Sequence, residues 1–308
     1  MLKTSRRAAQ RHLAVVTLVS AAIALSACAP TDEADSGSDS GSETSETSES
    51  SESEAPAADE CTPDAMETVA DGTLTIATDD PAYEPWFVDN DPTNGEGYES
   101  AVAYAIAEQL GYTQDQVAWV KVPFNKVVQP GPKDFDFDVN QVSITEARRK
   151  AVDFSSGYYD VVQTVITNKG SAIDGTTSLA DLADAKLGAQ VGTTSYTAIT
   201  DQIQPSQDPA VFDTNDQAVQ ALKNGQIDGI VVDLPTAYFM TAVQLDDGVI
   251  VGQLPLPDGE PEQFGAVLAK DSPLTDCVSS AVDTLREDGV LDQIGQEWLA
   301  QQGAPELS

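Results

Sequence analysis

Between residue 73 and the C-terminus, short apolar runs typical of β-strands alternate with segments of helical periodicity. The strands are expected at 73–78, 117–122, 136–142, 161–167, 187–191, 227–232, 249–252 and 264–269. Such alternation favours mostly parallel sheets flanked by helices. The strands are too many for one small lobe, and no linker rich in Gly or Pro separates two independent domains. We therefore expect an α/β fold of two lobes that share strand crossovers.

The helices between these strands carry recognisable ends. The helix expected at 99–110 places Val102, Ile106 and Leu110 on one face and stops at Gly111. Other expected N-terminal caps are Ser178 for 179–183, Thr214 for 216–223, Asp233 before Pro235, and Ser272 with Pro273 for one long C-terminal helix.

Composition excludes several functional classes. The 308 residues contain 15 Lys and Arg against 51 Asp and Glu, a formal net charge of −36. Such a chain offers no basic face for a nucleic-acid backbone, so nucleic acid is excluded as a partner. The only histidine, His12, lies in a segment that we expect to be removed. This excludes Ser-His-Asp and Cys-His catalysis and every His-ligated metal site, and we expect neither a metal nor a cofactor.

The first 27 residues have the pattern of an export signal. Basic residues at positions 3, 6, 7 and 11 precede an apolar run at 13–25 that is too short to span a bilayer. The following string, LSAC at 25–28, resembles the lipobox of bacterial lipoproteins. The resemblance implies cleavage before Cys28 and diacylglycerol on its sulfur. The alternative is an ordinary signal peptide with an unmodified Cys28.

Residues 28–60 are expected to form a disordered tether. Positions 31–60 contain nine Ser and eleven Asp or Glu, no Lys or Arg, and no apolar residue larger than Ala or Pro. Nothing there can offset the entropy of ordering the chain, and repulsion between like charges favours an extended spacer. A ligand-binding role for the acidic run is the alternative.

Two cysteines remain after the tether, Cys61 and Cys277. Outside the cytoplasm a cysteine pair is expected to be bridged, which would tie the start of the folded part to its C-terminal helix. Two unpaired thiols are the alternative.

Seven segments occur in an order and spacing that carry a family resemblance. They are ATDDPAYEPW (77–86), GYESAVAYAIAEQLG (97–111), VSITEARRKAVDFSSGYY (142–159), SLADL (178–182), GAQVGTTSY (188–196), ALKNGQIDGIVVDLPTA (221–237) and TLREDGVLDQIGQEW (284–298). Together, over essentially all of 72–300, they resemble the extracellular solute-binding proteins of family 3, receptors that supply polar amino acids to ABC importers.

The resemblance implies a two-lobed periplasmic-binding-protein-like fold, a Venus flytrap. Each lobe would be a mainly parallel sheet flanked by helices. Lobe one would comprise 61–158 and 256–308, lobe two 163–250, and the two crossover hinge strands 159–162 and 251–255.

An α-amino acid needs opposite charges held apart, because an unpaired buried charge is costly. The resemblance implies that Arg148, in the SIT motif, binds the ligand carboxylate, for which a guanidinium fork is suited. Asp233 ends an apolar strand, where open α/β sheets place their ligands, and would take the ammonium; its alternative is a helix N-cap. Thr193, Thr194 and Ser195 would point backbone N–H groups and hydroxyls at the carboxylate, or simply cap a helix.

The remaining expected contacts are a hydroxyl, Ser143, and several residues that would contact the ligand side chain. Ser143 could donate to the carboxylate or accept from the ammonium, or be only a strand-end hydroxyl. Tyr83 and Phe124 fall where the family places aromatic rings around the ligand's aliphatic part, although core packing explains Phe124 equally well. Side-chain readers are expected at Asp79, Asn140, Gln141 and Gln190. Asp138 would favour a cationic ligand if it faced the cleft beside Asp79 and would say nothing if it faced solvent.

These observations predict a non-enzymatic receptor that captures a polar or cationic amino acid and delivers it to an ABC permease. We expect a monomer, outside the cytoplasm, held at the membrane only by its lipid anchor. Two alternatives remain open. One is an enzyme on the same scaffold, dehydratase-like or cell-wall-cleaving, with Glu84 or Asp138 as its acid. The other is a lipid-anchored sensor without a transporter.

Overall fold

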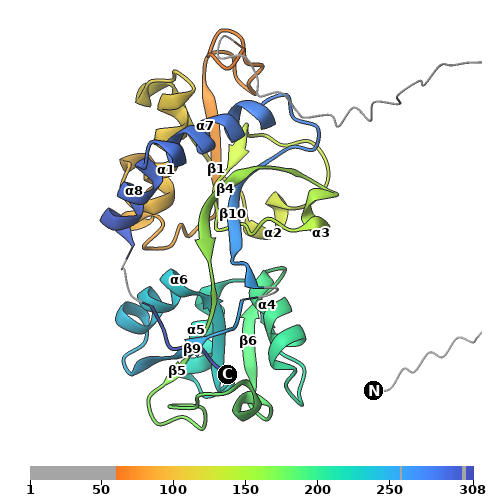
Figure 1. Cartoon of the computed structure of the whole chain (residues 1–308), viewed down its shortest axis with the longest axis vertical. Coiled ribbons are helices and arrows are strands. Elements are labelled where there is room, and N and C mark those ends of the chain that lie inside the picture. Colours follow the sequence, from red (N-terminus) through yellow and green to blue (C-terminus); the bar gives the residue numbers. More distant parts are fainter. Residues whose placement is uncertain (1–59, 257–258, 300–302) are drawn as a thin grey trace, which may run out of the picture. The chain divides into compact units, whose positions relative to one another are not determined.

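Two five-stranded sheets organise the part of the chain described by the computed structural model, which is residues 60–256, 259–299 and 303–308 (Figure 1). The first sheet has the order β2-β1-β3-β10-β4, formed by β1 (Leu74–Thr78), β2 (Val117–Lys121), β3 (Phe137–Asp138), β4 (Asp153–Val161) and β10 (Glu262–Leu268). The second has the order β7-β6-β8-β5-β9, formed by β5 (Gln163–Asn168), β6 (Leu187–Gln190), β7 (Ala210–Phe212), β8 (Gly229–Asp233) and β9 (Gly248–Gln253).

Helices accompany each sheet and define the two lobes. Lobe one contains the first sheet with α1 (Tyr98–Gln109), α2 (Phe124–Val127), α3 (Glu146–Arg149), α7 (Thr275–Glu287) and α8 (Val290–Trp298). Lobe two contains the second sheet with α4 (Thr194–Ala198), α5 (Asn215–Lys223) and α6 (Leu234–Phe239). Single 3-10 or π turns lie at Val88–Asn90, Pro92–Asn94, Gln114–Gln116, Leu179–Leu182, Ile199–Ile203 and Met240–Gln244. The expected two-lobed α/β fold is confirmed.

Each sheet is half parallel and half antiparallel, so the expectation of mainly parallel sheets is wrong. In lobe one β1 pairs parallel with β2 and β3, while β10 is antiparallel to β3 and β4. In lobe two β6 pairs parallel with β7 and β8, while β5 is antiparallel to β8 and β9. The antiparallel pairs arise where a strand enters from the other lobe.

The chain passes between the sheets at two strand crossovers. β4 ends at Val161 in the first sheet and β5 begins at Gln163 in the second, so the single strand expected at 161–167 is the junction of two strands (Figure 1). The return runs from β9 to β10. The side chains at these junctions therefore lie where the lobes meet.

The core of lobe one is aromatic around Trp86, which is fully buried. Its ring makes edge-on contacts with Tyr98, Tyr159 and Phe264. Gly97 is the N-cap of α1, where φ is +96° and an added Cβ would lie 2.5 Å from the Trp86 carbonyl oxygen. Glycine is required at this position, because no side chain fits between the helix start and the aromatic core.

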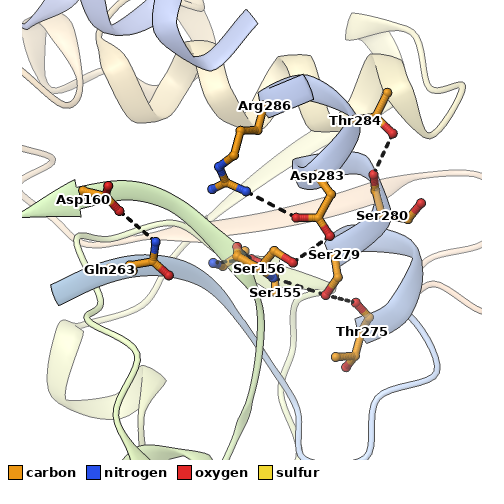
Figure 2. A network of polar contacts seen from close by, with 11 residues as sticks. Ser155, Ser156, Asp160, Gln263, Thr275, Ser279, Ser280, Asp283, Thr284 and Arg286 are labelled. Atoms are coloured by element: carbon orange, nitrogen blue, oxygen red, sulfur yellow. Dashed lines mark hydrogen bonds and ion pairs between the residues drawn. The ribbon is translucent and has the colours of Figure 1, made fainter. Parts of the chain in front are cut away.

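The C-terminal helical region differs from the single long helix that was expected. Ser272 accepts from the Leu274 N–H, and α7 begins only at Thr275; Gly289, at φ +73°, then separates α7 from α8. Figure 2 shows how α7 is fixed to β4: Ser156 Oγ donates to Asp283 Oδ2 over 2.9 Å, and Arg286 binds the other oxygen of the same carboxylate.

A disulfide joins Cys61 to Cys277, with Cα atoms 5.4 Å apart. It connects the segment before β1 to α7, so it lies entirely within lobe one. The two cysteines are 216 positions apart in the sequence, so the disulfide closes a long loop. Cross-links over long loops remove much of the entropy of the unfolded chain.

Residues 303–308 pack on lobe two, whereas the sequence places all of 256–308 in lobe one. The Gln253 N–H of β9 donates to the Pro305 carbonyl oxygen, and the Leu307 N–H donates to the Gln253 carbonyl oxygen. The Leu307 side chain, 1% exposed, completes the core of lobe two. Gly252 makes room for it, since a Cβ there would lie 2.7 Å from the Pro305 carbonyl oxygen. Figure 1 shows the C-terminus beside β9. A single leucine in a polar tail gives no sequence signal for this packing.

The expected signal peptide, Cys28 and nearly all of the tether lie outside the described residues. None of the helices formed by the described residues has the length and apolar character needed to span a membrane.

Candidate ligand-binding site

A cavity of about 50 Å³ lies between the two lobes. All twelve expected ligand contacts line it: Asp79, Tyr83, Phe124, Asn140, Gln141, Ser143, Arg148, Gln190, Thr193, Thr194, Ser195 and Asp233. Four further residues that the sequence did not indicate complete the lining: Gln163, Asn215, Val232 and Phe264. Small-molecule sites usually enclose several hundred Å³, so a ligand of amino-acid size requires the lobes to move apart.

Arg148 reaches from lobe one to lobe two. The short helix α3 begins after Thr145, whose hydroxyl accepts from the Arg148 N–H. The guanidinium lies over the Phe124 ring, donates from Nη1 to the Ser143 carbonyl oxygen over 2.6 Å, and donates from Nη2 to Gly192 of lobe two.

The charge of Arg148 is not neutralised inside the protein. Among the described residues no carboxylate lies within ion-pair distance of its guanidinium. Burial lowers the pKa of Arg148 to about 10, with the nearby Glu262 opposing the shift. The group remains charged at neutral pH and has donors left over, because a guanidinium carries five N–H bonds. It is suited to an anion.

Asp233 faces the same cavity from lobe two. It is the last residue of β8 and also caps α6, since Oδ1 accepts from the Thr236 N–H over 3.0 Å. The two functions proposed from the sequence are therefore compatible, because a carboxylate can accept several bonds. Burial raises the pKa of Asp233 to about 6, while the bonds from Thr236 oppose the shift. At pH 7 it is ionised and suited to a cation.

The 192–195 turn supplies further polar groups from lobe two. Thr193 caps α4 by accepting from the Tyr196 N–H, and its hydroxyl donates to the Gln190 carbonyl oxygen. The Ser195 hydroxyl donates to Gln163 Oε1 over 2.7 Å. Since both hydroxyl hydrogens are used within the protein, an anion would be bound by the N–H groups of the first helical turn.

Ser143 connects the lobes at the base of the cavity. Its hydroxyl lies 2.9 Å from Glu262 Oε2 and 3.1 Å from Thr194 Oγ1. Gln163 is within 3.4 Å of the same Thr194 and Glu262 atoms. Neither Gln163 nor Glu262 was expected at the site, because neither lies in a chemical motif and both belong to the crossovers.

The aromatic wall is positioned by Asp79. Its Oδ2 accepts from the Phe124 N–H over 3.3 Å, which holds the start of α2 beside the cavity. Burial raises the pKa of Asp79 and raises that of Tyr83 to about 12, so the phenol is neutral. Asp79 thus brings a carboxyl group next to two rings.

The side-chain amides of Asn140 and Gln141, which precede Ser143, differ in whether their nitrogen already has a hydrogen-bond partner. Gln141, at φ +49°, directs both its backbone N–H and its side-chain nitrogen to Glu99, a buried carboxyl that also binds the Tyr158 hydroxyl. Burial raises the pKa of Glu99 to about 7. Asn140 is 4% exposed, and its Nδ2 has no partner among the described residues. Asn140 is therefore the better candidate reader of a polar ligand group.

Asp138 lies neither in the cleft nor in solvent. It is fully buried in lobe one, paired in register with Ala77 and Val267. Its two oxygens have no hydrogen-bond partner among the described residues, and burial raises its pKa well above the usual range. It cannot touch a ligand in this cavity.

A larger cavity of about 570 Å³ lies beside α8 and α6, lined by Tyr98, Tyr238, Arg286 and their neighbours. Some of its polar groups already have partners: the Tyr98 hydroxyl donates to the Tyr158 carbonyl oxygen, and Arg286 pairs with Asp283. Its lining also contains the carboxylates of Asp160 and Asp292, neither of which forms an ion pair among the described residues.

Two lobes with opposite charges facing one cavity define a two-lobed ligand-binding protein. The chain is 27% identical over 227 residues to the arginine-binding extracellular protein ArtP of Bacillus subtilis, covering 70% of this chain and 82% of that protein. It is 29% identical over 218 residues to the ABC transporter glutamine-binding protein GlnH of the same organism, covering 69% and 77%.

Solved structures agree. The ancestral amino acid-binding protein AncCDT-1, a precursor of cyclohexadienyl dehydratase, is 30% identical and has a TM-score of 0.60 over 74% of this chain and 95% of that one. Residues 74–301 match the model of the bacterial extracellular solute-binding proteins, family 3, and the chain belongs to this family.

Proposed function

We propose that this protein captures a free α-amino acid in the cavity between its lobes and delivers it to the permease of an ABC importer. The observation that carries the proposal is that Arg148 of lobe one and Asp233 of lobe two line one cavity. A carboxylate and an ammonium on the same carbon match this pair, and both lobes must close to satisfy both charges. The relatives are named as binding proteins, and this chain is proposed to be non-enzymatic.

A cationic or polar side chain fits the remainder of the cavity. Asp79 places a carboxyl group beside the Tyr83 and Phe124 rings, where it would attract a positive group, and Asn140 offers an amide donor. Aromatic faces add apolar contact and favour cations. Arginine, lysine, ornithine, glutamine and citrulline are therefore the first candidates.

A thermal-shift screen tests the ligand proposal. The panel contains the twenty amino acids together with ornithine, citrulline and cystine. A ligand present at 100 times its Kd stabilises the folded state by about 2.7 kcal/mol. At least one α-amino acid should raise the unfolding temperature, while its decarboxylated amine should not. A panel in which no compound raises it contradicts the proposal.

Attachment to the membrane is a second part of the proposal. The mature protein would begin at a lipid-bearing Cys28, reside outside the cytoplasm as a monomer, and reach its permease from the membrane surface. The full-length chain should pellet with membranes, and Cys28→Ala should be released into the soluble fraction. Continued pelleting of the variant contradicts lipidation. In size-exclusion chromatography, elution at the smaller volume typical of a dimer contradicts the monomer.

A further inference from the structure

Each crossover contributes one side chain to the polar groups at the cavity: Gln163 lines the cavity, and Glu262 accepts from the lining residue Ser143. Gln163 is the first residue of β5 and pairs in register with Asp233, whereas Glu262 is the first residue of β10 and pairs with Val161. Their side chains lie within 3.4 Å of each other, from Gln163 Nε2 to Glu262 Oε2. The hinge and the binding site are therefore in direct contact.

Hydrogen counting fixes the direction of the bonds that follow. The Ser143 hydroxyl donates its single hydrogen to Glu262 Oε2 over 2.9 Å. Ser143 must then accept from Thr194, 3.1 Å away on lobe two. Thr194 in turn accepts from Gln163 Nε2.

The last link completes the chain. Gln163 Oε1 accepts from the Ser195 hydroxyl over 2.7 Å. The bonds thus run from Ser195 through Gln163, Thr194 and Ser143, and all of them end on Glu262. Two of these residues belong to the 192–195 turn of lobe two, and the terminal acceptor belongs to lobe one.

We propose that Glu262 is a positioning residue of the binding site: it orients the hydroxyls of Ser143 and Thr194 and holds lobe two against lobe one around the ligand. This role rests on the proposed amino-acid binding. Because the chain of bonds crosses between the lobes, its loss should speed the opening of the lobes, and so ligand dissociation, more than it slows ligand association. Hydrogen bonds to charged groups are strong enough for an effect of about tenfold or more.

The test measures Kd by calorimetry and the dissociation rate by stopped-flow fluorescence, with the amino acid that the screen identifies. Trp86, whose indole donates to Thr236 of lobe two over 2.9 Å, provides a signal for lobe separation. Glu262→Gln should weaken binding about tenfold, mainly through faster dissociation. Glu262→Asp, which keeps the charge but shortens the side chain, should do the same. The exposed Glu260→Gln removes the same charge nearby and should leave Kd unchanged.

A double-mutant cycle separates positioning from a general structural role. Ser143→Ala removes the donor, so Glu262→Gln should add less than twofold to the loss in that background. Gln263→Ala, which breaks only the bond to Asp160 seen in Figure 2, should not couple to Ser143.

Failure has two distinguishable forms. If the wild-type protein binds the amino acid and Glu262→Gln binds it equally well, or if the two losses are additive, the positioning role is wrong. If Glu262→Gln does not fold, the Glu262→Asp arm decides by the same criteria. If the wild-type protein binds none of the compounds, the proposed function falls and this role with it.

Discussion

Nη2 of Arg148, on lobe one, donates to the carbonyl oxygen of Gly192, on lobe two, over 2.9 Å. The guanidinium that faces the cavity is thus also part of the contact that closes it. A ligand carboxylate placed between Arg148 and the first turn of α4 would strengthen both at once. Binding and closure are expected to be linked through this one side chain.

The first prediction concerns the fork geometry of Arg148. Arg148→Lys keeps a positive charge but cannot bind the Gly192 carbonyl and a carboxylate side by side. Truncating one partner of a buried charge pair costs on the order of 2–5 kcal/mol, so Kd should rise at least thirtyfold, measured by calorimetry. Arg149→Lys is the matched control: Arg149 is exposed and lies over Phe154, outside the cavity. Equal losses in both variants would contradict the assignment.

The second prediction is a pH dependence of ligand affinity. Burial raises the pKa of Asp233 to about 6 in the free protein. An ammonium ligand needs the ionised form, so affinity should be level above pH 7 and fall below pH 6 by up to about tenfold per unit. Asp233→Asn should bind weakly with no such slope between pH 5 and 7, and the exposed Asp213→Asn should keep it. A slope that persists in Asp233→Asn would assign the titration elsewhere.

The third prediction concerns stability and Glu99. Burial raises its pKa in the folded state to about 7 from an ordinary value of 4.5. The fold prefers the protonated form, so the stabilisation is fully present below pH 4.5 and is lost as pH rises to about 7, by roughly 3 kcal/mol. In urea titrations at several pH values, the wild-type free energy of unfolding should fall over this range relative to Glu99→Gln. Glu108→Gln, exposed on the same helix, should follow the wild type. Parallel curves for wild type and Glu99→Gln would refute the shift.

The fourth prediction concerns the C-terminal segment. Leu307 is 1% exposed in the core of lobe two, and replacing a buried leucine by alanine costs about 2 kcal/mol or more. Leu307→Ala should lower the unfolding temperature by several degrees in calorimetry, while the exposed Glu306→Ala should change it little. If both variants unfold like the wild type, the packing of residues 303–308 on β9 contributes nothing to stability.

Local sequence patterns were sufficient to predict those elements whose ends are marked by residues in the sequence itself. The helix expected at 99–110 is α1, and Gly111 ends it at φ +84°. β4 was not predicted as a strand, because DFSSGYYDV mixes small, polar and aromatic residues. It becomes a strand by pairing with β10, where Gly157 leaves room for Gln263. Such pairing is set by residues a hundred positions away and leaves no local pattern.

The site shows the same division. Arg148 and Asp233 were predictable because a motif and a strand end mark them. Gln163 and Glu262 were not, since the direction of a crossover side chain depends on how one strand leaves a sheet and another enters it. Gln141 lines the cavity as expected, but its left-handed backbone and Glu99 direct its amide nitrogen into lobe one. The position of Asp138 was left open between the cleft and solvent, and it lies in neither, because strand register decides which face it takes.

The Cys61–Cys277 bridge also determines how force enters the protein. A force applied to the chain before Glu60 is transmitted through the disulfide to α7 before it reaches β1. The disulfide therefore protects β1 from being pulled out of its sheet. During opening and closing, lobe one would stay fixed and lobe two would move relative to it.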